Sequence, residues 1–167
     1  MKKPTVYLDT NIISAYWHEA ADVLLLARRF ATRDWWEKER EFFSVVASNV
    51  TEGELEAGVF PRQSDCLKMV RRLRYLPVTS KVHELAARLL AERIIPKEKP
   101  VDALQLAVAV AHQVDYLLTW NYAHLANPTA QQKVANFCRL ETLKPPSLVS
   151  PESIPKALLG QSIRRPK

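Results

Sequence analysis

Hydrophobic residues follow two different periods along the chain, and the alternation of these periods predicts the fold. Short β-branched and aromatic runs at residues 4–8, 44–47 and 116–119 are typical of buried strands. Between them, apolar residues recur every three or four positions, which predicts helices with one apolar face. Strands that alternate with helices indicate an α/β domain with a mostly parallel sheet of about four to five short strands, flanked by helices.

The helical periods are clear enough to give approximate bounds. In chain order they predict a short helix after Asp9 and a long helix at 20–43. Further helices are predicted at 51–58, at 101–113, at 129–140 and finally at 151–159, and two more begin at Pro61 and at Thr79 or Ser80. A last short strand is expected at 148–149. In the long helix, the apolar stripe consists of Val23, Leu24, Ala27, Phe30 and Ala31. We expect that stripe to form the apolar face of the helix.

Length and composition bound the class of protein. The 167 residues, 47% of them hydrophobic, predict one folded domain over 1–159, followed by a basic tail at 160–167 that need not be ordered. No apolar run approaches the roughly 18–20 residues of a membrane span. Asp9 and Asn11 interrupt the first apolar run, so we expect no secretory signal. Two cysteines are too few for a disulfide framework, which favours a reducing, cytoplasmic location.

Charge and glycine content add two weaker constraints. The formal net charge of +6 favours polyanionic partners without proving one. Three glycines in the whole chain leave no glycine-rich loop that could cradle a phosphate, so a P-loop or dinucleotide fingerprint is absent.

Acidic and amide side chains stand where predicted strands end or helices begin. Asp9 follows the first strand, Glu54 lies in the helix at 51–58, Asp102 opens the helix at 101–113, and Asn121 follows the strand at 116–119. Each of the three acids has an ordinary explanation: Asp9 as a helix cap, Glu54 as the partner of Thr51 in a capping box, and Asp102 as a first-turn acid. Together they match the oxygen ligands of a hard divalent cation at the carboxyl ends of parallel strands.

Three segments of the chain resemble the PIN-domain ribonucleases, specifically the VapC-type toxins of prokaryotic toxin–antitoxin modules. The segments are VYLDTNIISAYW, TEGELEAG and KPVDALQLAVAVAHQVDYLLTWNYAHLAN. Their order and spacing match the family from about residue 5 to 127, and SLVSPESIPKALL is similar to its closing strand and helix. The third segment is the most specific, because it combines an acid that opens an Ala-rich helix with a strand that ends in LLTWN.

The resemblance implies a PIN-like three-layer fold and a metal-dependent endoribonuclease with one or two Mg²⁺ or Mn²⁺ ions. The implied catalytic and metal-binding positions are Asp9, Glu54, Asp102 and Asn121. The implied supporting positions are Thr10, Asn11 and Thr119. The fourth catalytic position is acidic in many members of the family, so the neutral asparagine leaves three negative charges. The implied partners are an RNA substrate, a small antitoxin protein and a second copy of the toxin, with no membrane.

Basic residues gather after Pro61, on the next predicted helix and beyond it. They are Arg62, Lys68, Arg71, Arg72 and Arg74, and they offer a positive surface to an RNA backbone. The ordinary explanation is a solvated helix face. Two other functions stay open: a non-catalytic PIN-like module that binds RNA or a protein partner, which the neutral Asn121 favours, and a structure-specific DNA nuclease with the same acids. The RNA target, the number of metal ions and the antitoxin are not fixed by the sequence.

Overall fold

A five-stranded sheet forms the centre of the computed structural model, which describes residues 2–19 and 21–156. Its strands are β1 (Thr5–Leu8), β2 (Ser44–Ala47), β3 (Arg74–Tyr75), β4 (Tyr116–Leu118) and β5 (Ser147–Val149). They lie in the order β3-β2-β1-β4-β5, and each neighbouring pair is parallel. All five carboxyl ends therefore meet at one edge of the sheet, where ligands bind in open parallel sheets.

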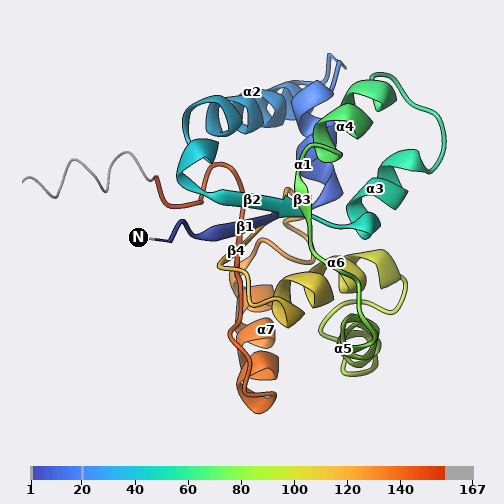
Figure 1. Cartoon of the computed structure of the whole chain (residues 1–167), viewed down its shortest axis with the longest axis vertical. Helices are drawn as coiled ribbons and strands as arrows, with labels where there is room; N and C mark the ends of the chain where they lie inside the picture. Colours follow the sequence, from blue (N-terminus) through green and yellow to red (C-terminus); the bar gives the residue numbers. More distant parts are fainter. Residues whose placement is uncertain (1, 20, 157–167) are drawn as a thin grey trace, which may run out of the picture.

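Helices cover both faces of the sheet (Figure 1). They are α1 (Thr10–Trp17), α2 (Val23–Lys38), α3 (Asn49–Glu56), α4 (Gln63–Val70), α5 (Ser80–Ala91), α6 (Pro100–Ala111) and α7 (Pro128–Leu140), with a 3-10 turn at Arg40–Phe42. Helices α1 to α4 lie on one face, and α5 to α7 lie on the other. The predicted three-layer α/β fold is confirmed.

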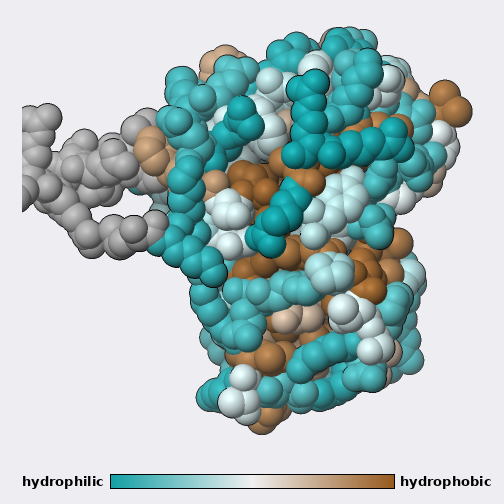
Figure 2. Space-filling model, in the orientation of Figure 1, coloured by the Kyte–Doolittle hydropathy of each residue, from teal (hydrophilic) through white to brown (hydrophobic). Residues whose placement is uncertain are grey.

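Two hydrophobic cores result, one on each face, because successive side chains of a strand point to opposite sides. Val6 and Leu8 of β1 pack with α1, α2 and α4, whereas Tyr7 packs with α5, α6 and α7. Helix α6 is the most buried, since every residue from Gln105 to Val110 has no exposed surface. Figure 2 shows hydrophilic side chains over most of the α1–α4 layer, with hydrophobic groups visible where the two layers meet.

The apolar stripe predicted for the long helix does not face the core, so this prediction is wrong. Val23, Leu24 and Phe30 are 82%, 59% and 77% exposed, whereas Thr32 and Trp35 on another side of α2 are buried. Helix α2 is also shorter than predicted. It begins after Asp22, whose side chain caps it, and ends at Lys38.

The physical reason lies in the arginines of α2, which pack against the end of α1. Arg29 Nη1 donates to the carbonyl of His18 at 3.0 Å, and Arg33 Nε donates to the carbonyl of Tyr16 at 2.9 Å. Carbonyls at the end of a helix have no partner within it, so these guanidinium groups satisfy them. The arginine-rich side of α2 therefore faces the protein, which a simple apolar period does not reveal.

Other helix and strand predictions agree with the structure to within a few residues, with two exceptions. The two-residue strand β3 was not predicted. The final helix at 151–159 is wrong in its described part, because residues 151–154 form turns and a bend; its last residues and the basic tail lie outside the described residues. No helix in the described ranges is long and apolar enough to cross a membrane.

Candidate active site

Asp9 directly follows the central strand β1, and only 5% of its surface is exposed. Its Oδ2 accepts hydrogen bonds from Thr119 Oγ1 at 2.7 Å and from Asn11 Nδ2 at 3.1 Å. Asn11 Oδ1 in turn accepts from the backbone N–H of Trp120 at 2.8 Å. The side chain of Asp9 makes no capping hydrogen bond to α1, so the structure does not support its reading as a helix cap.

The environment of Asp9 makes its charge costly. Burial raises the pKa of Asp9 to about 7, although the hydrogen bond from Thr119 opposes the shift. The carboxylates of Glu54 and Asp102 raise that pKa further through repulsion, which shows that the three predicted acids lie in one region. A cation bound between them would relieve this repulsion.

Glu54 reaches the site from the middle of α3. Its Oε1 accepts from Thr10 Oγ1 at 2.6 Å and from Gln105 Nε2 at 2.8 Å. The predicted capping box is wrong, because α3 begins one turn earlier, with Ser48 as its cap at 3.1 Å from Val50 N. Glu54 is thus not needed at the helix end and is held by side chains of α1 and α6.

Gln105 is a site residue that the sequence did not assign. Its carbonyl oxygen accepts from the hydroxyl of Tyr7, which also lies 2.6 Å from Ser48 Oγ, and its amide nitrogen donates to Thr10 Oγ1 at 2.9 Å and to Glu54. Burial raises the pKa of Tyr7, so its hydroxyl stays protonated as a donor. The signal in the sequence was a glutamine within an otherwise apolar helix.

Asp102 and Asn121 meet on the other side of the site. Asp102 lies in the first turn of α6, where the helix dipole favours a carboxylate. Asn121 Nδ2 donates to Asp102 Oδ2 at 3.0 Å, and Asn121 Oδ1 accepts from the backbone N–H of His124 at 3.0 Å. The backbone N–H of Asn121 also donates to Thr119 Oγ1, which links this pair to Asp9.

The hydrogen bonds share a feature that bears on ligand binding. In Asp9, Glu54 and Asp102, every side-chain donor reaches one carboxylate oxygen: Oδ2, Oε1 and Oδ2, respectively. Within the described part of the chain, no side-chain donor bonds the second oxygen of any of the three, although the backbone N–H of Thr10 also interacts with the Asp9 carboxylate. The bonded oxygens orient each group, and the second oxygens are left free of side-chain donors.

The donor set fits a hard divalent cation in its chemistry, because carboxylate and amide oxygens are the ligands that Mg²⁺ and Mn²⁺ prefer. The mutual repulsion around Asp9 supports the same reading. The site is not preassembled, however, since no three Asp, Glu, His or Cys side chains in residues 2–19 and 21–156 form a group that could hold a metal as they stand.

Comparison with known proteins identifies the family. A model of the PIN domain matches residues 6–125. The chain belongs to the PIN domain family. This match spans all four predicted catalytic positions and confirms the resemblance seen in the sequence. A search of curated proteins finds no significant match to the chain.

The PIN domain described here is similar in fold to several solved structures. One is a toxin–antitoxin complex from Klebsiella pneumoniae, with a TM-score of 0.52, 20% identity and coverage of 75% of this chain and 94% of that chain. A second is VapC20, a sarcin-ricin loop cleaving toxin of Mycobacterium tuberculosis. Its TM-score is 0.51 at 22% identity, and the match covers 68% of this chain and 87% of that chain. A third is FitAB bound to an IR36 DNA fragment. Its TM-score is 0.55 at 16% identity, and the match covers 92% of this chain and 99% of that chain.

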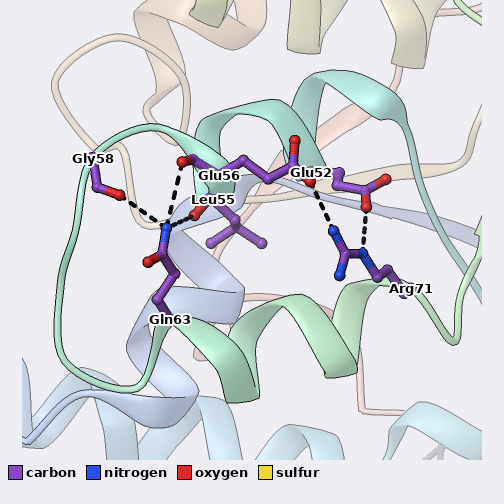
Figure 3. A network of polar contacts seen from close by, with 6 residues as sticks. All are labelled: Glu52, Leu55, Glu56, Gly58, Gln63 and Arg71. Carbon is purple, nitrogen blue, oxygen red and sulfur yellow. Dashed lines mark hydrogen bonds and ion pairs between the residues drawn. The ribbon is translucent and has the colours of Figure 1, made fainter.

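The basic residues proposed from the sequence as an RNA surface are partly engaged within this PIN domain. Arg71 Nε and Nη2 lie 2.5 and 2.7 Å from carboxylate oxygens of Glu52 and Glu56, and Gln63 Nε2 donates to the carbonyl of Leu55 at 2.8 Å (Figure 3). These contacts fasten α4 to α3. The guanidinium of Arg71 is therefore occupied in the fold.

Arg62 is engaged in the same way. It pairs with Glu19 at 2.9 Å and with Asp65 at 2.6 Å, and its guanidinium lies 4.7 Å from the centre of the Trp17 ring. Lys68 and Arg72, in contrast, are exposed and make no ion pair within the described residues. Of the five basic residues predicted to contact RNA, Arg62 and Arg71 are thus paired within the described part of the chain, whereas Lys68, Arg72 and Arg74 are exposed without an ion pair there.

Proposed function

We propose that this PIN domain is a metal-dependent endoribonuclease that acts as the toxin of a toxin–antitoxin module. The observation that carries the proposal is the buried Asp9, whose pKa is raised to about 7 beside two further acids at the carboxyl edge of the sheet. Maintaining such a cluster is costly for folding, and cation binding is the function that offsets the cost. RNA cleavage is the activity expected of this family, and VapC20, whose fold is similar, is a sarcin-ricin loop cleaving toxin.

In this mechanism Asp9, Glu54, Asp102 and Asn121 would hold Mg²⁺ or Mn²⁺, which polarises a phosphate and lowers the pKa of a water. The site would hold one or two such ions. The hydrogen bonds on Asp9 and Glu54 keep one oxygen of each carboxylate fixed. Fixed groups cost no reorganisation when charge develops on the phosphate.

Asn11, Thr10 and Thr119 act as positioning residues in this proposal. Thr119 and Asn11 orient the Asp9 carboxylate, and Thr10 orients Glu54. None of these neutral side chains adds negative charge to the site. They can therefore hold the acids in place without increasing the repulsion between them.

The test is cleavage of a labelled RNA by the purified protein, in Mg²⁺ or Mn²⁺ and in EDTA. We expect cleavage only with metal, and its loss in Asp102→Asn. A matched control is Glu84→Gln on α5, an exposed acid outside the site, which should cleave as the unmodified protein does. Cleavage in EDTA, or retained cleavage in Asp102→Asn, would contradict the proposal. Binding of RNA with no cleavage would support the non-catalytic alternative, and preferred cleavage of DNA would support a DNA nuclease.

We further propose a small antitoxin protein as a partner. The similar structure from Klebsiella pneumoniae is a toxin–antitoxin complex. The exposed apolar side chains Val23, Leu24 and Phe30 on α2 supply a surface that a partner would cover. Co-expression with the product of a neighbouring small reading frame, followed by co-purification and light scattering, tests the antitoxin and a homodimer together. A monomer that captures no such product would contradict both.

The proposed location is the cytoplasm. Cys66 and Cys138 are buried free thiols, and burial raises the pKa of each to about 11, so neither is disposed to form a disulfide. Fractionation of cells that produce the protein checks this location directly.

A further inference from the structure

A groove of about 920 Å³ lies beside the acidic site, between the loop that follows α5 and the beginning of α7. Three cations line it: Arg93, Lys97 and Lys133. His124 also lines the groove, and its backbone N–H donates to Asn121 Oδ1, so the groove adjoins the catalytic asparagine. A single carboxylate, that of Glu98, is the acid among its lining residues.

These three cations have no ion-pair partner among residues 2–19 and 21–156. All are exposed, and none makes an ion pair or side-chain hydrogen bond within the described ranges. Arg62, Arg71 and Arg88, in contrast, each contact two carboxylates. Unpaired like charges around one cavity repel each other and do not stabilise the fold, so an anionic ligand is the natural reason for their placement.

Arg93 adds a second indication. Its φ of 54° is the left-handed conformation that follows α5, where glycine is the favoured residue. The backbone N–H groups of the two following residues both reach the carbonyl of Leu89, so the conformation itself belongs to the helix end. The end of α5 requires only this left-handed backbone conformation, which a glycine would adopt without strain. The chain has an arginine at this position instead, and its long cationic side chain lies beside the groove.

We propose that this groove binds the phosphates of single-stranded RNA that flank the cleaved bond. The proposal rests on the proposed ribonuclease function. The acids of the candidate site would attract a divalent cation, but their negative charge repels the phosphates of RNA. Lys97 and Lys133 supply the positive charge that holding these phosphates requires. The first turn of α7, which starts at Pro128 on the groove wall, adds the positive end of a helix dipole. The uncharged part of the wall, which includes Ile94 and Pro96, offers apolar surface to bases and sugars.

The expected effect follows from counterion release. Each phosphate contact with a single strand contributes roughly 0.7 to the slope of log affinity against log salt. At about 0.15 M salt, this corresponds to roughly fourfold in affinity per contact, and to about 15-fold for two contacts. Removing both lysine charges should therefore weaken RNA binding about 15-fold and make the salt dependence shallower by roughly 1.4.

The experiment compares two variants with equal loss of charge. Lys97→Gln/Lys133→Gln removes two charges from the groove, and Lys81→Gln/Arg139→Gln removes two exposed charges outside it, on α5 and in the last turn of α7. Binding of a labelled single-stranded RNA is measured by fluorescence anisotropy in EDTA over a range of salt concentrations, with thermal unfolding as a check of folding. We expect the groove variant to lose about 15-fold in affinity, and the Lys81→Gln/Arg139→Gln variant to lose much less.

Several outcomes would overturn the proposal. If the unmodified protein cleaves RNA and the groove variant binds RNA with unchanged affinity and salt slope, the groove proposal fails while the proposed function stands. If the unmodified protein neither binds nor cleaves RNA, both fail. If the groove variant binds RNA normally but loses affinity for a poly-glutamate peptide, the groove serves a protein partner instead. Equal losses in the two variants would show that only the net charge matters.

Discussion

Replacing Asp9 by asparagine is expected to abolish RNA cleavage and to stabilise the fold at neutral pH. In the native protein, burial raises the pKa of this carboxyl from 3.8 to about 7. The amide oxygen of an asparagine can accept the hydrogen bonds from Thr119 and Asn11. Unlike the carboxylate, it carries no charge for burial and the neighbouring acids to penalise.

The size and sign of the effect follow from that pKa. The shift is roughly three pKa units, and each unit is worth about 1.4 kcal/mol, so ionised Asp9 costs the folded state up to about 4 kcal/mol. Below about pH 4 the carboxyl is neutral in both states and the cost is absent. Between about pH 4 and 7 only the unfolded chain releases its proton, so the free energy of unfolding falls as pH rises, and above pH 7 the loss is complete.

The asparagine does not recover this whole amount. Its amide N–H groups replace an oxygen at a buried position, which takes back about 2 kcal/mol. About 2 kcal/mol then remains, equivalent to roughly 4–8 °C in Tm for a domain of this size. The assay is thermal unfolding followed by circular dichroism in EDTA at about pH 4 and about pH 8, with Glu84→Gln as the control. A Tm gain for Asp9→Asn that is absent at pH 8, or equally large at pH 4, would refute the reasoning.

Three further substitutions test the site and the fold. Gln105→Leu should lower the free energy of unfolding by about 2 kcal/mol in a urea titration, because the buried Tyr7 hydroxyl loses an acceptor; an unchanged midpoint would show that this bond is unimportant. Phe30→Ser should change the free energy of unfolding by less than about 0.5 kcal/mol, whereas Trp35→Ala should lower it by about 3–5 kcal/mol. A larger loss for Phe30→Ser than for Trp35→Ala would show that the predicted apolar stripe of α2 does face the core. Asn121→Asp adds a fourth carboxylate to the site, so calorimetry should show that this variant binds Mn²⁺ more tightly than the unmodified protein. Thermal unfolding in EDTA should show a lower Tm for the variant, because the added charge is then unbalanced. Equal metal affinity in both proteins would contradict this prediction.

Four of the five described strands and most helices were predictable from the sequence, because the apolar residues of each element contact one of the two cores. Helix α5 shows this clearly: Val82, Leu85, Ala86 and Leu89 follow a helical period and all are buried. Helix α2 could not be predicted in the same way. Its arginines face α1 because they satisfy carbonyls there, and its best apolar stripe points to solvent. Periodicity reports hydrophobic burial and is silent on polar groups buried by hydrogen bonds.

The positions of the candidate site were predictable for a topological reason. Asp9 and Asn121 follow neighbouring parallel strands, and parallel strands bring their carboxyl ends to one edge. The orientation of each side chain was not predictable, because it depends on partners far away in the chain. Gln105 is the clearest case: it contacts Tyr7 and Glu54, and neither lies within its own helix.

The same partners explain how three acids can coexist in a folded protein. Neutral donors hold one oxygen of each carboxylate at Asp9, Glu54 and Asp102, which fixes the three groups in place without adding charge. These bonds do not remove the repulsion at the most buried acid, so Asp9 retains a pKa of about 7 and is partly protonated near neutral pH. A bound cation would have to displace that proton. If the site binds a metal as proposed, binding should therefore release protons and strengthen as pH rises through 7. The repulsion that weakens the fold is the interaction that such a cation would relieve.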